Sequence, residues 1–440
     1  MPLYTWSTYC RIAVAGVSRE ASCPETVTVC VPCVSRLPPV SFYRYCQYRT
    51  FIFILSSDLV LRTCFEMRLA LNFPDFSLPG QQTPQLSVGE GMRVAQLGFG
   101  TWSWGNKLLW GYDEANDAKL QEAFDTVFKQ STPFDGRRFF FDTGDSYGTG
   151  KLEGRAEQLL GTFRREIAKP ERCVIGTKLA IYPTRLTGAS FEDACRSSLQ
   201  RMGREQIELV QAHWSAQNFQ PWQEPAVWDG LARCHEAGLA RAVGTSNYGP
   251  KQLVKANTYW RERGVPHTVN QVLTTAFSSR HKRPCMHVLT TARAFLPQVQ
   301  LSLLSQLPLE SGQIESCREL GVTPIGYSPL ALGVLSGKYD EGTLPEGPRG
   351  LIFKALLPSC RPLLGTLREI AQARGVSMSA VAINWCMGKG CLVIVGMKSP
   401  EQVADNLAAL TFTLGTAEVD ELERAAAKAK KATQNIFQTV

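Results

Sequence analysis

The chain has 440 residues, of which 44% are hydrophobic and 20% are charged, with 36 Gly and 25 Pro. This composition excludes collagen, coiled coils and a wholly disordered chain. No apolar run reaches the roughly 18 residues that a membrane-spanning helix needs, so we expect a soluble globular protein without a membrane partner. The formal net charge of +8 is concentrated in residues 1–70 and 273–297. The near-neutral remainder argues against nucleic-acid binding.

The first residues differ in composition from the rest. Residues 1–106 contain no Lys, and residues 1–70 are rich in Arg, Ser and Cys and poor in acidic residues. This bias is typical of an organelle transit peptide; a translated upstream region, with initiation near Met67, is the alternative. Because residues 81–90 have the composition of a polar linker, we interpret residues 1–91 as an N-terminal extension and 92–440 as the folded domain.

Cysteine is also concentrated at the start of the chain. Cys30 and Cys33 have the spacing of a metal or redox pair, but no second pair or nearby His completes a site. The remaining cysteines are scattered, which suits a reducing compartment and ordinary packing. We therefore expect no metal site.

From Met92 onward, short apolar runs alternate with amphipathic stretches. The apolar runs predict strands at Val94–Thr101, Arg138–Thr143, Cys173–Leu179, Ile207–His213, Ala240–Ser246, His267–Val272, Thr323–Tyr327 and Leu392–Met397. The amphipathic stretches predict helices at Asp117–Lys129, Arg155–Ile167, Phe191–Met202, Ala226–Ala237, Lys251–Arg263, Gln313–Leu320, Pro362–Arg374, Met378–Met387, Glu401–Leu410 and Ala417–Ala429. Eight strand–helix units favour parallel strands in a closed barrel. The sequence thus predicts an α/β protein with a (β/α)8 TIM barrel.

One connection does not fit this pattern. Residues 273–299 follow the sixth predicted strand without regular periodicity, and the pair Gln271-Val272 is repeated at Gln298-Val299. Removing residues 273–299 joins two halves that read as a single strand, so we interpret them as an irregular insertion at strand six. A functional lid is the alternative, because long loops in compact domains often carry function.

Four polar residues follow three successive predicted strands. Asp142 and Tyr147 end or follow the second strand, Lys178 lies in the third and His213 ends the fourth. In a parallel barrel these strand ends meet at one mouth, where the active site of such proteins lies. Each residue alone has an ordinary structural explanation, but the four together favour a catalytic site.

This set of residues is suited to proton donation. A Tyr phenol titrates near pH 10, so it is a poor acid near neutrality. We expect the Lys178 ammonium to lower the pKa of Tyr147 and Asp142 to keep that ammonium charged. Tyr147 would then protonate a carbonyl oxygen, and His213 would orient the carbonyl. Such a site supplies no hydride, so it needs a nicotinamide cofactor.

The sequence resembles the aldo-keto reductase family from Met92 to Val440. The matching motifs are Gly98-Phe-Gly-Thr-Trp102, Asp142-Thr-Gly-Asp-Ser-Tyr147-Gly148, Thr177-Lys178, His213-Trp214, Gly244-Thr-Ser246-Asn247, Tyr327-Ser328-Pro329-Leu330, Lys398-Ser399 and Asp405-Asn406. The resemblance implies a catalytic tetrad of Asp142, Tyr147, Lys178 and His213. It also implies hydride transfer from NADPH to a small aldehyde or ketone.

The resemblance also implies a set of cofactor contacts. Ser246, Asn247 and Gln271 would bind the carboxamide of the nicotinamide, with Gln298 as a duplicate candidate. The other implied contacts are Thr101, Trp102, Tyr327, Ser328, Leu330, Gly333, Lys338, Arg349, Lys398, Ser399, Gln402, Asp405 and Asn406. The preference for NADP would rest on Lys338, Arg349 and Lys398, for which a solvated basic loop is the alternative.

The substrate pocket is predicted from aromatic residues. Trp102, Trp110, Trp214 and Phe437 are candidates to line it, and the alternative is that most of these rings belong to the core.

Long runs outside the catalytic motifs resemble chloroplast members of the family, which predicts a chloroplast location, with the cytoplasm as the alternative. Gly144 departs from the family pattern, where Ala is usual. Two other functions stay open: a broad aldehyde reductase, and a cofactor-binding protein inactivated by residues 273–299.

Overall fold

The structure, a computed structural model, describes residues 85–129, 136–272 and 302–429. Eight parallel strands close into a barrel in the order β10-β3-β4-β5-β6-β7-β8-β9. They are β3 (Leu97–Gly100), β4 (Phe139–Asp142), β5 (Cys173–Leu179), β6 (Ile207–Ala212), β7 (Ala240–Ser246), β8 (His267–Val272), β9 (Thr323–Tyr327) and β10 (Leu392–Gly396). The predicted (β/α)8 barrel is confirmed.

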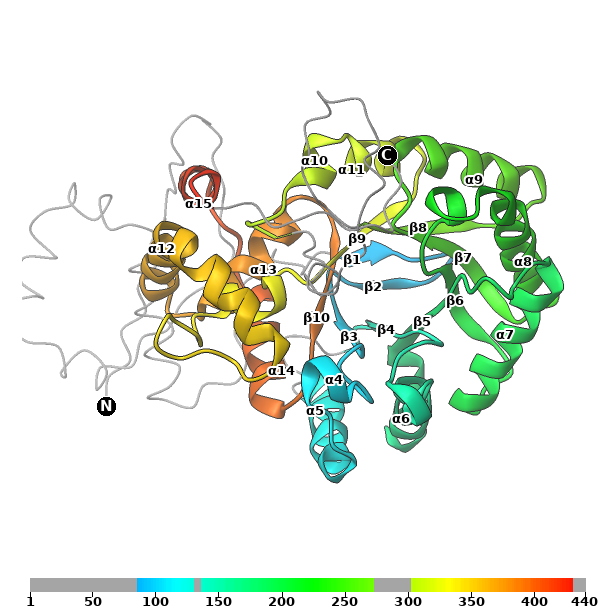
Figure 1. Ribbon diagram of the computed structural model, residues 1–440, viewed down its shortest axis with the longest axis horizontal. Helices are drawn as coiled ribbons and strands as arrows, with labels where there is room; N and C mark the ends of the chain where they lie inside the picture. Colours follow the sequence, from blue (N-terminus) through cyan, green and yellow to red (C-terminus); the bar gives the residue numbers. More distant parts are fainter. Residues whose placement is uncertain (1–84, 130–135, 273–301, 430–440) are drawn as a thin grey trace, which may run out of the picture. The chain divides into compact units, whose positions relative to one another are not determined.

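Helices surround the barrel (Figure 1). They are α4 (Lys107–Trp110), α5 (Asp117–Lys129), α6 (Arg155–Glu166), α7 (Gly188–Met202), α8 (Glu224–Glu236), α9 (Pro250–Glu262), α10 (Leu307–Glu310), α11 (Gln313–Glu319), α12 (Pro348–Arg374), α13 (Met378–Gly388), α14 (Pro400–Leu407) and α15 (Thr416–Ala427). Within the described residues, no helix combines the length and the apolar composition of a membrane span.

Alternation along the strands separates two cores. Phe140 of β4 points into the barrel and packs with Val174 and Leu209, whereas Phe139 and Phe141 belong to the larger core under the helices. Successive strand residues point to opposite faces, so a run of three aromatic residues packs both inside the barrel and under the helices. The same alternation places Asp142, two residues after Phe140, on the inner face at the end of the strand.

The first predicted strand is two strands in the structure. β2 (Arg93–Ala95) pairs antiparallel with β1 (Gln85–Ser87), and the barrel strand β3 begins only after Gln96. The Gln96 amide donates to Met387 O and Cys391 O at 2.7 and 3.0 Å, which turns the chain into the barrel. β1 lies in the stretch that we interpreted as linker, because its polar composition gives no strand signal.

The longest helix was predicted only in part. α12 runs from Pro348 to Arg374 and contains Pro358 and Pro362, whereas the sequence predicts a start at Pro362. Proline disfavours a helix interior because it removes a hydrogen bond and crowds the preceding turn. Burial of ten side chains of this helix outweighs that local preference.

Three predictions lie outside the described residues: the extension before residue 85 with Cys30 and Cys33, the insertion at residues 273–299, and the position of Phe437.

Candidate active site

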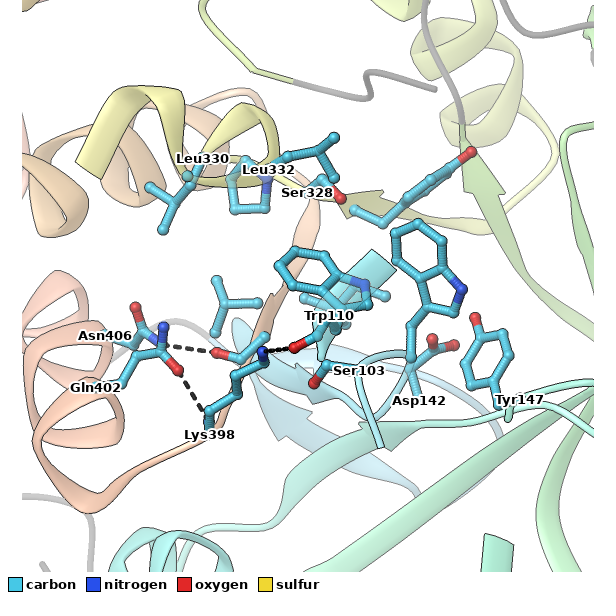
Figure 2. Close-up of a pocket in the computed structure, with 18 of the residues that line it drawn as sticks. Ser103, Trp110, Asp142, Tyr147, Ser328, Leu330, Leu332, Lys398, Gln402 and Asn406 are labelled. Carbon is cyan, nitrogen blue, oxygen red and sulfur yellow. Dashed lines mark hydrogen bonds between the residues drawn. The ribbon is translucent and has the colours of Figure 1, made fainter. Parts of the chain in front are cut away.

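A cavity of about 780 Å³ lies at the carboxyl ends of the barrel strands (Figure 2). Its volume is typical of sites for cofactors and small molecules. Its wall includes the four predicted catalytic residues Asp142, Tyr147, Lys178 and His213, and the predicted aromatic residues Trp102, Trp110 and Trp214. The cavity is also lined by Ser246, Asn247, Gln271, Tyr327, Ser328, Leu330, Gly333, Lys338, Arg349, Lys398, Ser399, Gln402, Asp405 and Asn406.

Thr101 alone among the described predicted cofactor residues does not line the cavity. Its side chain is buried, and the hydroxyl donates to the backbone oxygen of Asp142 at 3.0 Å. Thr101 therefore ties the end of β3 to the end of β4.

An ion pair occupies the floor of the site. Lys178 Nζ donates to Asp142 Oδ1, and both side chains are almost wholly buried. Burial raises the pKa of Asp142, while the charge of Lys178 and a hydrogen bond from Gln271 oppose that rise. Burial likewise lowers the pKa of Lys178, and Asp142 offsets part of this effect. Each charge is thus stabilised mainly by the other.

Tyr147 lies beside this pair and is itself buried. Lys178 Nζ is 5.1 Å from the centroid of the Tyr147 ring, and the His213 ring centroid is 5.7 Å from it. Burial raises the pKa of Tyr147 well above its usual value, and the charge of Asp142 raises it further. Our expectation of a lowered pKa for Tyr147 is therefore wrong, because burial and the charge of Asp142 dominate at this site.

Gly144 faces the same ring. A Cβ atom at this position would lie 3.2 Å from Tyr147 Cε1 and 3.3 Å from Cδ1. The alanine that is usual in the family would therefore press against the Tyr147 ring in this chain.

His213 is held by its neighbours on two sides. Its Nδ1 lies 3.3 Å from Ser146 Oγ, and its backbone oxygen accepts a bond of 3.0 Å from the Asn247 amide. Burial and the positive charge of Lys178 place the pKa of His213 well below its usual value. The imidazole is therefore neutral near pH 7. Ser146 was not among the predicted site residues, although it directly precedes Tyr147 in the same motif.

The opposite end of the cavity is basic. Lys338, Arg349 and Lys398 line it, and burial together with the charges of Arg349 and Lys338 lowers the pKa of Lys398 to about 8. Tyr339 joins this group: Lys338 Nζ is 5.4 Å from its ring centroid, and an Arg349 nitrogen is 3.4 Å from its hydroxyl. Three cations that repel one another in one wall favour an anionic ligand.

Between the two ends, the loop after β9 has an unusual backbone. Ser328, Ala331 and Leu332 have φ of 47°, 48° and 60°, and Gly333 has φ of 107°. Residues other than Gly adopt such values at a cost, and they cluster at functional sites. This loop forms the cavity wall where the sequence predicts backbone contacts.

Polar side chains without partners mark places for a ligand. Gln271 Oε1, Arg349 Nε and Asn406 Oδ1 are buried and have no hydrogen-bond partner among the described residues. Other cavity residues are already paired: Tyr327 donates to Asn247 Oδ1 at 3.0 Å, and Gln402 Oε1 accepts from Lys398 N at 2.8 Å. A buried polar atom without a partner is costly. The residues present therefore fit a nicotinamide dinucleotide, with an acceptor for its carboxamide and cations for its phosphates.

A group of cavity residues besides Ser146 was not predicted from the sequence. They are Gly100, Ser103, Pro329, Leu332, Ser336, Tyr339, Ser379, Ile394, Val395 and Gly396. Several of them lie within one or two residues of a predicted site residue, as Tyr339 does beside Lys338. This closeness in sequence is the signal that could have found them. Ser379 lies in the first turn of α13, and nothing in its local sequence points to a cavity.

Comparisons with known proteins agree with this architecture. The model of the Aldo/keto reductase family matches residues 96–306 and 290–427. The chain therefore belongs to the aldo-keto reductase family, and it is an oxidoreductase that interconverts carbonyl and hydroxyl groups. The resemblance read from the sequence motifs is confirmed.

Particular relatives can be named. The chain is 46% identical over 354 residues to the chloroplastic pyridoxal reductase of Arabidopsis thaliana, and the match covers 79% of this chain and 88% of the relative. The crystal structure of the thermostable aldo-keto reductase Tm1743 covers 78% of this chain and 99% of its own, at 21% identity and a TM-score of 0.55. A Bombyx mori aldo-keto reductase in complex with NADP covers 79% and 94%, at 17% identity and a TM-score of 0.53. At these identities the two structures establish the fold alone.

Proposed function

We propose that the protein reduces pyridoxal to pyridoxine with NADPH. The observation that carries the proposal is a single cavity with the buried Asp142–Lys178 pair and Tyr147 at one end and three cations at the other. The similarity to a pyridoxal reductase supports the choice of substrate. The complex of a family member with NADP supports the choice of cofactor.

NADPH would supply the hydride when bound, and the described residues include candidates to hold its carboxamide and its phosphates. Ser246, Asn247 and Gln271 would hold the carboxamide, where Gln271 Oε1 is a free acceptor. Lys338, Arg349 and Lys398 would bind phosphate oxygens, because they form the cationic end of the cavity.

The residues around Tyr147 deliver the proton. A raised pKa keeps the phenol protonated at neutral pH, so Tyr147 can donate to the aldehyde oxygen as negative charge develops there. Lys178, close to the ring, stabilises the phenolate that is left. The neutral imidazole of His213 can donate a hydrogen bond to the same oxygen while Ser146 holds its Nδ1 side.

Aromatic rings give the site its affinity for a flat substrate. The ring centroids of Trp214 and His213 are 4.9 Å apart, and Trp102 lines the same cavity. Planar rings such as the pyridine of pyridoxal stack well on indoles. We therefore propose that Trp102 and Trp214 contact the substrate ring.

The test is a comparison of substrates with the purified full chain. We expect NADPH oxidation with pyridoxal, with a kcat/KM well above that for propanal. Equal values for the two aldehydes would instead support a broad aldehyde reductase. Tight NADPH binding without turnover of either aldehyde would support the cofactor-binding protein.

We further propose that the protein acts in the chloroplast. The relative from Arabidopsis thaliana is chloroplastic by name, and residues 1–70 are rich in Arg and Ser and poor in acidic residues. A fluorescent protein fused after residue 91 should enter chloroplasts in plant cells, and the same fusion without residues 1–91 should not.

A further inference from the structure

Trp110, the last residue of α4, lies among the basic residues of the cavity. The Arg349 guanidinium carbon is 4.6 Å from its ring centroid, and Lys398 Nζ is 4.9 Å from it. Lys398 Nζ also donates to the Trp110 backbone oxygen at 3.0 Å. Figure 2 shows Trp110 between Lys398 and the side of the cavity that holds Asp142 and Tyr147. The residue therefore links α4 to α12 and to the segment after β10.

These contacts offset the repulsion between Arg349 and Lys398. Arg349 and Lys398 carry like charges, and their proximity contributes to the lowered pKa of Lys398. The negative face of an indole attracts cations, and the carbonyl of Trp110 accepts a hydrogen bond from Lys398. Trp110 thus allows two cations to remain close together in the wall of the cavity.

The indole also offers a donor of its own. Trp110 Nε1 is buried and has no hydrogen-bond partner in the part of the chain that the structure describes. An indole nitrogen can only donate, and a buried donor without a partner is costly. The Trp110 N–H lies beside two cations, so this place is complementary to an anionic oxygen. An apolar group could not accept its hydrogen bond.

The contact with Trp102 separates the two ends of the cavity. Trp102 meets Trp110 edge to face, with ring centroids 5.8 Å apart and an interplanar angle of 81°. Trp102 directly follows Thr101, whose backbone N–H and hydroxyl both donate to Asp142 O, whereas the ring of Trp110 contacts cations. The two tryptophans, which the sequence grouped as substrate candidates, therefore have different surroundings.

We propose that Trp110 is a cofactor-binding residue whose indole N–H donates to a phosphate oxygen of NADPH while its ring holds Arg349 and Lys398 in position. The inference rests on the proposed function, since NADPH is the ligand. It replaces the substrate role that we expected for Trp110 from the sequence.

The test measures NADPH affinity by calorimetry in the full chain. Trp110→Phe keeps a ring against the cations but removes the N–H, so we expect Kd to rise about tenfold or more, as for a lost hydrogen bond to a charged group. Trp110→Leu also removes the aromatic face and should weaken binding further. Trp228→Phe is the matched control, because it removes another buried indole N–H, from α8 and outside the cavity. Its Kd should equal that of the wild type.

A second measurement uses the unaltered protein. In heteronuclear NMR spectra of the indole N–H groups, the signal that is missing from Trp110→Phe should shift when NADPH is added. A Trp110→Phe variant that binds NADPH like the wild type, or an unshifted signal in NADPH-saturated wild type, overturns this inference alone. A raised KM for pyridoxal with an unchanged NADPH Kd also overturns it and returns Trp110 to the substrate side. A wild-type chain that does not bind NADPH overturns the proposed function as well.

Discussion

At the scale of single residues, burial decides how Tyr147 acts. The phenol is enclosed by Lys178, Asp142 and His213, and its pKa is raised, so it remains a neutral proton donor at any physiological pH. The reaction therefore depends on stabilising the phenolate only at the moment of transfer. Lys178 is suited to that task, because it lies close to the ring and Asp142 favours its charged form.

Replacing Tyr147 with Phe should separate binding from chemistry. Phe preserves the ring beside Lys178 and His213 but has no proton to donate. We expect the rate of pyridoxal reduction in single-turnover experiments to fall by about 10²–10⁴-fold, the usual contribution of a positioned acid. NADPH affinity, measured by fluorescence titration, should stay the same. Unchanged turnover would contradict the proton-donor assignment.

Lys398 should make cofactor binding depend on pH. Its pKa of about 8 means that it is charged below that pH and loses its charge above it. A neutral Lys398 attracts phosphate less, so the Kd for NADPH should rise between about pH 7 and about pH 9, by up to about tenfold per pH unit. Binding above pH 8 should be accompanied by proton uptake, which calorimetry in buffers of different ionisation enthalpy detects.

Lys398→Arg is the control for this effect, because Arg stays charged over the whole range. Its Kd should vary little with pH. A wild-type Kd that is equally flat would show that another cation binds the phosphates.

At the scale of elements, periodicity predicted most of the barrel. The strands β5, β7, β8 and β9 have the predicted bounds to the residue, because buried parallel strands are short apolar runs between clear breaks. Failures occurred where tertiary contacts override local preference. α12 continues through two prolines to bury its side chains, and β1 is a polar strand that pairs only because β2 lies beside it.

The hairpin of β1 and β2 should be part of the folded domain. Val88, in its turn, is fully buried with Met92 in the core inside the barrel. Thr268 and Thr323, at the starts of β8 and β9, donate to Val88 O at 2.8 Å and Ser87 O at 2.6 Å. The hairpin therefore covers the end of the barrel opposite to the active site.

Truncation tests this boundary. A chain that begins at Met92 lacks the Val88 side chain and both hydrogen bonds, so its free energy of unfolding in guanidinium should fall by about 2–4 kcal/mol relative to one that begins at Gln82. The chain that begins at Gln82 should match the full chain. Equal stability of the two truncated chains would place the domain start at Met92, as the composition suggested.

At the scale of the whole molecule, the location of the site residues could be predicted from the sequence, but the pKa of Tyr147 could not. Asp142, Lys178 and His213 could be placed together because a parallel barrel gathers strand ends at one mouth. The direction of the Tyr147 pKa shift could not be predicted, because burial depends on the packing of all eight strand–helix units. The position of Trp110 depends likewise on α12 and the loop after β10, which are more than 200 residues away in sequence.

The pairing of β8 in the barrel bears on whether residues 273–299 are needed for the site. β8 pairs with β7 as far as Gln271 and with β9 as far as Val272, and the backbone oxygen of Gln271 accepts from Asn247 N at 2.8 Å. These contacts place Gln271 in the cavity wall, while Gln298, which repeats its motif, lies outside the described residues. The sixth strand is thus complete on both of its edges before the proposed insertion begins.

Deleting residues 273–299 should therefore leave NADPH binding intact. We expect the shortened chain to bind NADPH in a fluorescence titration with the Kd of the full chain and to reduce pyridoxal at least as fast. In the full chain, Gln271→Ala should weaken NADPH binding, because it removes the buried acceptor for the carboxamide, whereas the matched Gln298→Ala should not. If instead the deletion abolishes binding and only Gln298→Ala weakens it, the second glutamine belongs to the site and residues 273–299 are part of the working barrel.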